Sequence, residues 1–147
     1  AVCRRRVRPL ALRSSMARGR DVHQARIAAL QGLGRHLARR CRSPCEVCEA
    51  SGVPLRPFEV TPLVDDPDLD ETIFVCDTCR DGLAGGPLDD PRWRCLESAV
   101  WSDVRPVQVL AVRLVRRLAD AGQVWAINLL EGLYLDDEVL ARIDSGS

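Results

Sequence analysis

Four of the seven cysteines in this chain occur as two closely spaced pairs, Cys45 with Cys48 and Cys76 with Cys79. A gap of two residues lets both sulfur atoms of one turn reach the same ion, and a second pair completes a tetrahedron of sulfur ligands. Thiolates favour zinc over hard cations such as magnesium or calcium. The spacing therefore predicts one zinc ion held by Cys45, Cys48, Cys76 and Cys79, which we call the four-cysteine site.

A site with four protein ligands has no open position for water or substrate, and such sites are normally structural. Metal binding of this kind contributes about 10 kcal/mol or more to folding. Cys41 lies four residues before Cys45 and is the alternative ligand, whereas Cys95 is expected in the apolar core beside Trp93. A redox dithiol is the other interpretation of a CxxC pair, but it requires a βαβ unit that the sequence does not show.

Residues 43–90 are expected to form the zinc-binding module, because proline and glycine recur there and the apolar runs are short. Two strands are predicted, over Leu55–Val60 and Thr72–Val75. The acidic segment 65–71 between them resembles the start of a calcium loop, but Glu71 stands where that loop needs a glycine. We therefore expect a solvated loop between the two strands.

Residues 91–147 are expected to form a helical subdomain. Apolar residues recur every three or four positions over Val107–Leu118, the clearest amphipathic pattern in the chain. Pro106 suits the first turn of this helix, where its missing N–H costs nothing. A further helix is predicted over Val124–Glu131, and Asp136 is placed to cap a last one.

The N-terminal part is strongly basic. Residues 1–19 lack a sustained apolar period and are expected to form a disordered basic arm, of which the part before Met16 also fits an upstream extension. A basic helix is predicted over residues 20–42, because Asp21 and Gln24 form a capping box at its start. The predicted class is thus α+β: a small zinc ribbon or treble-clef module with four cysteine ligands, an N-terminal helix and a C-terminal helical subdomain.

The neutral net charge conceals two halves of opposite sign. Residues 1–42 contain twelve arginines and one acid, a net charge of +11, and residues 43–147 carry the balancing −11. A basic segment of this strength predicts nucleic-acid binding, attraction to the chain's own acidic part, or attraction to a protein partner. No apolar run approaches the roughly 20 residues that a membrane span needs, and the basic start is not followed by a secretory leader. We expect a cytoplasmic protein without membrane contact.

Several segments of the chain resemble the PhnA-like family of small bacterial zinc-ribbon proteins, which are named for alkylphosphonate utilization. The likeness runs in matching order across residues 36–143 and is carried by Arg42–Cys48, Phe74–Cys79, Trp93–Leu96, Trp101–Val104, Pro106–Val109 and Leu133–Glu138. The resemblance implies zinc binding in a cytoplasmic protein. One departure is Glu49, where the family pattern has a glycine, and a residue with a Cβ is expected to strain the turn around the metal.

The residues favour a non-catalytic function. Hydrolysis of a carbon–phosphorus bond needs an activated nucleophile with an electrophilic metal or iminium, yet the chain has only His23 and His36 and no lysine. We therefore predict a structural zinc-binding protein that acts as a binding or regulatory factor. The alternative is a nucleic-acid-binding relative of HNH treble-clef nucleases without their catalytic histidines, since the segment Phe58–Pro62 contains none.

Overall fold

The computed structural model describes the backbone of residues 10–146 and the side chains of residues 18–146; residues 1–9 and 147 lie outside the described residues. The chain combines helices with one two-stranded antiparallel sheet, which confirms the α+β class. In chain order the elements are α1 (Leu10–Cys41), β1 (Leu55–Glu59), η1 (Leu69–Glu71), β2 (Thr72–Cys76), α2 (Asp77–Leu83), η2 (Pro91–Cys95), α3 (Leu96–Ala99), α4 (Arg105–Asp120), α5 (Val124–Gly132) and α6 (Asp137–Ser145).

The sheet is a hairpin in which Leu55 pairs with Cys76 and Glu59 pairs with Thr72. Both strands lie within one residue of the predicted ranges. Strand β2 is buried at four of its five positions and supplies Ile73 and Val75 to the core. The chain passes directly from β2 into α2, so the hairpin and α2 hold Cys76 and Cys79 close together.

Helix α4 is the centre of the helical subdomain. Its buried side chains recur at helical spacing along the helix, as the apolar pattern predicts. It contacts α5, α6 and α3 and also touches α2, β2 and η1. Pro106 lies in its first turn, and the side chain of Asp136 accepts a hydrogen bond from the backbone of Val139 at the start of α6. The two short helices α5 and α6 thus both pack against α4.

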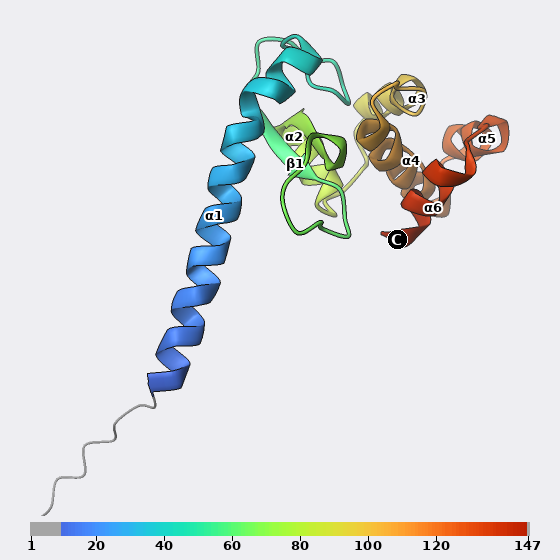
Figure 1. Cartoon of the computed structure of the whole chain (residues 1–147). Helices are drawn as coiled ribbons and strands as arrows, with labels where there is room; N and C mark the ends of the chain where they lie inside the picture. Colours follow the sequence, from blue (N-terminus) through green and yellow to red (C-terminus); the bar gives the residue numbers. More distant parts are fainter. Residues whose placement is uncertain (1–9, 147) are drawn as a thin grey trace, which may run out of the picture.

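Helix α1 starts earlier than predicted. It begins at Leu10, directly after Pro9 in the sequence, so the expectation of a disordered arm is wrong for residues 10–19, and residues 1–9 lie outside the described part. Segment 10–20 is rich in leucine, alanine and arginine, which are good helix formers. The helix extends away from the body of the molecule (Figure 1), so its first half needs no apolar face and its sequence shows no period.

The second half of α1 is tied to the body through contacts with β1, β2 and η1. Leu37 is fully buried in that contact, whereas Val22 is 70% and Ile27 is 37% exposed. Burial of the apolar side chains along α1 is therefore complete at Leu37, partial at Leu33 and Leu30, and lost farther toward the N-terminal end. No helix among the described residues is long and apolar enough to cross a membrane.

Candidate metal centre

The first cysteine pair lies in a turn between α1 and β1. Inside this turn the backbone N–H of Glu49 donates to the carbonyl of Cys45 at 2.9 Å, and the N–H of Cys45 donates to the carbonyl of Ala50 at 3.0 Å. The turn is fastened to the sheet because the N–H of Glu46 donates to the carbonyl of Phe74 at 3.1 Å. The turn thus fixes Cys45 and Cys48 before any metal is considered, and we call it the first knuckle.

The second pair comes from the junction of β2 with α2. Cys76 is the last residue of β2, and Cys79 lies one turn into α2, so both sulfur atoms point back toward the first knuckle. The backbone N–H of Cys76 donates to the sulfur of Cys45 at 3.4 Å. Backbone N–H donors of this kind stabilise a thiolate and orient its sulfur.

The four sulfur atoms all lie within 4.8 Å of one another, so the four cysteines that the sequence selects can hold a metal ion. Sulfur atoms at the corners of a tetrahedron, each about 2.3 Å from its centre, are about 3.8 Å apart. The distance between the Cys48 and Cys76 sulfurs is 3.7 Å. Cys45, Cys76 and Cys79 are buried and Cys48 is half-buried, so the site is closed on most sides.

The sulfur atoms also shift one another's ionisation. A hydrogen bond with the Cys79 side chain lowers the pKa of Cys45 to about 4. The same hydrogen bond raises the pKa of Cys79, because the proton is held between the two sulfurs. Because metal ligation requires deprotonated thiols, Cys45, Cys48, Cys76 and Cys79 would hold an ion as thiolates, and binding would release their remaining protons.

The backbone at Glu49 is strained, as expected for a residue with a Cβ at this position of the turn. Its φ is 61°, in the left-handed region where a residue with a Cβ is disfavoured and glycine is not. The residue closes the first knuckle immediately after Cys48. The expected strain at this position is therefore present in the structure.

Arg92 places a positive charge beside the cysteine sulfurs, and this contact was not predicted from the sequence. Its guanidinium donates to the sulfur of Cys48 at 3.8 Å, across 44 positions of sequence. Four thiolates around a divalent ion carry a net charge of −2, so a neighbouring guanidinium offsets part of that charge. No local signal marks this contact, because it joins the first knuckle to η2 through the fold.

Arg40 fastens α1 to the first knuckle. Its guanidinium makes two hydrogen bonds of 2.9 Å to the carboxylate of Glu46, whose side chain is only 5% exposed. The same group donates to the carbonyls of Leu69 at 2.8 Å and Thr72 at 2.7 Å. One side chain thus joins the helix, the knuckle, η1 and β2.

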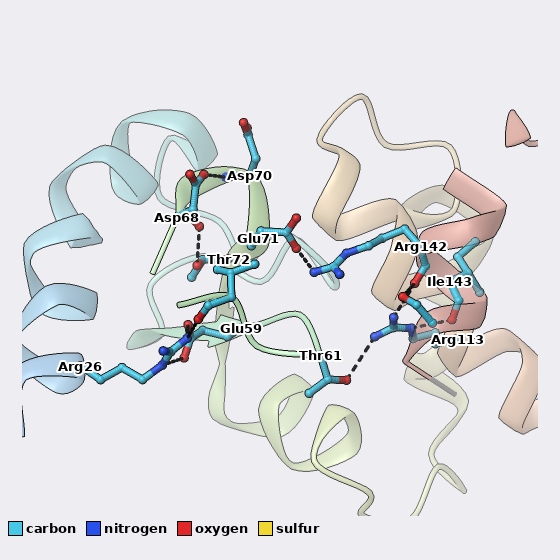
Figure 2. A network of polar contacts seen from close by, with 12 residues as sticks. Arg26, Glu59, Thr61, Asp68, Asp70, Glu71, Thr72, Arg113, Arg142 and Ile143 are labelled. Atoms are coloured by element: carbon cyan, nitrogen blue, oxygen red, sulfur yellow. Dashed lines mark hydrogen bonds and ion pairs between the residues drawn. The ribbon is translucent and has the colours of Figure 1, made fainter. Parts of the chain in front are cut away.

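Arg26 makes the second attachment of α1, farther along the hairpin. Its guanidinium binds both carboxylate oxygens of Glu59, at 3.0 and 2.5 Å (Figure 2). It also donates to the carbonyls of Val64 and Asp65. Two of the arginines in the predicted basic helix are therefore used to dock it on the acidic module.

The other candidate residues lie outside the site. The Cys41 thiol donates to the carbonyl of Ala38 and is not part of the four-sulfur cluster. Cys95 packs against the core, as expected, and burial is the main cause that raises its pKa to about 11. In segment 65–71, Asp68 accepts a hydrogen bond from the backbone of Asp70 and caps η1.

Comparisons with known proteins identify no relative. Neither the family models, nor the curated proteins, nor the solved structures include a match to this chain. The case for the metal centre therefore depends on the geometry and donor chemistry of the four-cysteine site.

Proposed function

We propose that the four-cysteine site binds one zinc ion, which stabilises the fold, and that the protein is a non-catalytic binding or regulatory factor. The observation that carries this proposal is the cluster of four sulfur atoms within 4.8 Å of one another. Four soft thiolates in this arrangement suit zinc better than any hard cation. Because these thiolates must stay reduced, the proposal includes a reducing, cytoplasmic location.

The structural role follows from how the ligands are distributed. The cysteines come from three separate segments: the first knuckle, the end of β2 and α2. A tetrahedral ion with four protein ligands has no position left for substrate. Its binding energy is therefore available to hold these three segments together.

The order of knuckle, hairpin and helix supports a treble-clef assignment for residues 43–90, which we make as part of the proposal. The PhnA-like resemblance, with its name for alkylphosphonate utilization, is likewise proposed as the chain's affiliation. It is supported by the motif order in the sequence and by the left-handed backbone at Glu49, where the family pattern has glycine.

Metal analysis of two cysteine variants tests the zinc proposal. Purified protein is expected to contain one zinc per chain by elemental analysis and native mass spectrometry. Cys79→Ser removes a buried ligand and is expected to abolish stoichiometric zinc, whereas Cys41→Ser is the matched control and should retain it. Iron in the isolated protein, or equal zinc in both variants, would overturn the assignment.

Nucleic-acid binding through α1 is the second candidate, and the exposure of its arginines favours it. Five arginines between residues 18 and 42 are exposed and have no ion-pair or hydrogen-bond partner for their guanidinium among the described residues: Arg18, Arg20, Arg35, Arg39 and Arg42. They differ in this from Arg26 and Arg40, which dock the helix. The free part of α1 extends away from the acidic body (Figure 1), where a phosphate backbone could approach it without repulsion.

A salt-dependent titration tests this second function. Labelled 20-nucleotide DNA and RNA are titrated with the full chain at rising salt, and the slope of log affinity against log salt is measured. Replacing Arg18, Arg20, Arg35 and Arg39 with glutamine is expected to reduce that slope by up to about 3. The control replaces the same number of exposed arginines on the body, of which the first, third and fourth are ion-paired with an acid: Arg56, Arg80, Arg94 and Arg105. Absence of binding at low salt, or equal slopes for the two variants, would reject the nucleic-acid function.

A further inference from the structure

A pocket of about 320 Å³ lies between the zinc-binding module and the side of α4. Phe58 comes from β1 and Leu83 from α2, while Leu110 and Leu114 come from α4, so its lining is largely apolar. The rest of the lining consists of Thr61, Arg113, Arg116, Arg117, Asp120 and Gly146. We call this the α4 pocket. Its size is at the lower end of the range for small-molecule sites, about 300 to 1,000 Å³.

Arg113 lines the pocket without a carboxylate partner among the described residues. Its guanidinium donates to the carbonyls of Ile143 and Arg142, at 3.1 and 2.7 Å, and to the hydroxyl of Thr61 at 3.3 Å (Figure 2). These acceptors are neutral, so they orient the group without cancelling its charge. Burial, followed by the nearby charge of Arg142, lowers the pKa of Arg113. The side chain still stays protonated, since an arginine does not lose its proton in proteins.

Arg117 is the second guanidinium in the pocket that the described residues leave without a carboxylate. It donates to the carbonyl of Gly82 at 2.6 Å and to that of Gly86 at 2.9 Å. Both bonds fix the side chain against the end of α2. Two positively charged groups are thereby held at fixed positions beside the apolar side chains of the pocket, where they can attract an anion.

The remaining charges limit how much negative charge the pocket can accept. Arg116 is paired with Asp144 at 2.6 Å, so its charge is already balanced. Asp120 also lines the pocket and contributes one negative charge. The two guanidinium groups of Arg113 and Arg117 against this one carboxylate leave an excess of about one positive charge. This excess favours a singly charged ligand over a dianion such as phosphate.

We propose that the α4 pocket binds a small organic monoanion, a carboxylate carried on a compact apolar body. The carboxylate lies between Arg113 and Arg117 and accepts from the guanidinium N–H groups that remain free, since the hydrogen bonds described above use three of the five donors of Arg113 and two of the five of Arg117. The apolar body lies against Phe58, Leu110 and Leu114. None of the four cysteines lines the pocket, so its ligand would not contact the proposed metal ion.

A titration of the metal-loaded full chain tests this site by ¹H–¹⁵N correlation spectra. Phenylacetate is the probe, phenylacetamide is its uncharged match, and inorganic phosphate tests for anion binding without an apolar body. Phenylacetate is expected to give saturable shifts at Thr61 and along α4 below about 10 mM, the range for a ligand of this size. Equal binding of the amide, equal binding of phosphate, shifts elsewhere, or no saturation by that concentration would each overturn the proposal.

Two charge variants, one expected to weaken phenylacetate binding and one expected to tighten it, separate an effect on binding from a loss of folding. Arg117→Gln is expected to weaken phenylacetate binding about tenfold, because a charge-assisted hydrogen bond is lost. Asp120→Asn removes the opposing charge at an exposed position and is expected to tighten binding about twofold. Glu131→Gln, at an exposed acid near the end of α5, is the control and should leave the affinity unchanged. Equal affinities for Asp120→Asn and this control would contradict the charge argument.

Discussion

At the scale of single residues, the first knuckle combines strain with a strong ion pair. Glu49 adopts a left-handed backbone, while Glu46, three residues earlier, is held in a bidentate pair with Arg40. The fold can keep the strained residue because the knuckle is fastened on both sides, to β2 through the backbone and to α1 through Arg40. Each of these two features predicts the effect of a substitution.

Glu49→Gly is expected to stabilise the protein by about 1 kcal/mol. The gain arises because glycine adopts the observed φ of 61° without the steric cost of a Cβ. The free energy of unfolding in denaturant is the measurement. The control is Glu131→Gly at an exposed position in the last turn of α5, where the backbone is helical and glycine is expected to give no gain in stability. A loss of stability in Glu49→Gly would contradict the account of the knuckle.

Arg40→Gln is expected to destabilise the protein by about 2 to 3 kcal/mol. The substitution leaves the nearly buried carboxylate of Glu46 without its partner and also removes the donors to two backbone carbonyls. Arg39→Gln is the neighbouring control, since Arg39 is exposed and its guanidinium has no partner among the described residues. It should change the unfolding free energy by less than about 0.5 kcal/mol. Equal effects in the two variants would show that Arg40 does not anchor α1.

At the scale of elements, the module of residues 43–90 and the C-terminal helical part meet through close packing at α2. A Cβ at Gly82 would lie 2.4 Å from the indole of Trp93, so the helix can approach η2 only with glycine there. Gly32 in α1 has the opposite setting, with nothing within 4 Å of the position of its Cβ. Replacement of glycine by alanine is therefore expected to destabilise the protein at Gly82 and to stabilise the helix at Gly32.

Gly82→Ala is expected to cost about 1 to 3 kcal/mol, because the buried Trp93 ring must move. Gly32→Ala should instead raise the helix content of α1, since alanine is favoured over glycine in a helix by about 1 kcal/mol. Thermal unfolding measures the first effect, and circular dichroism at 222 nm measures the second. If the Gly82→Ala variant unfolds at the same temperature as the parent protein, the close contact described between Gly82 and the Trp93 ring is contradicted.

The elements also show how far sequence reasoning reaches. Helix α4 follows from its local apolar pattern, because it buries one face against the body. The two strands follow from short segments bounded by turn residues, and β2 is buried at four of its five positions. The start of α1 could not be predicted in this way. A helix that extends away from the body needs only residues of high helix propensity, so its sequence shows no apolar periodicity. The four cysteines were predictable from their spacing, whereas Arg40 and Arg92 were not. Their contacts join segments that only the fold brings together.

At the scale of the whole molecule, one core joins the metal centre to the C-terminal helices. Val60 and Ile73 from the module of residues 43–90 belong to the same buried cluster as Val107 and Val115 from α4. Glu71 and Arg142 form an ion pair between η1 and α6 (Figure 2). The two parts are therefore expected to unfold together instead of as separate units.

Removal of the metal by a chelator is expected to expose α4 to hydrogen exchange as well as the knuckle. The loss follows because Ile73 and Val75 leave the shared core when the sulfur ligands separate. Hydrogen–deuterium exchange measured by mass spectrometry, before and after chelation, gives the protection of each segment. Protection that is lost near Cys45 but retained in α4 would show that the two parts fold independently.

The central claim is that four sulfur atoms surround one zinc ion, and X-ray absorption at the zinc edge of the isolated protein tests it most directly. The account predicts a single shell of four sulfur ligands at about 2.3 Å, with no nitrogen or oxygen ligand. A shell containing nitrogen or oxygen, or fewer than four sulfurs, would contradict the four-cysteine site and the structural role proposed for it.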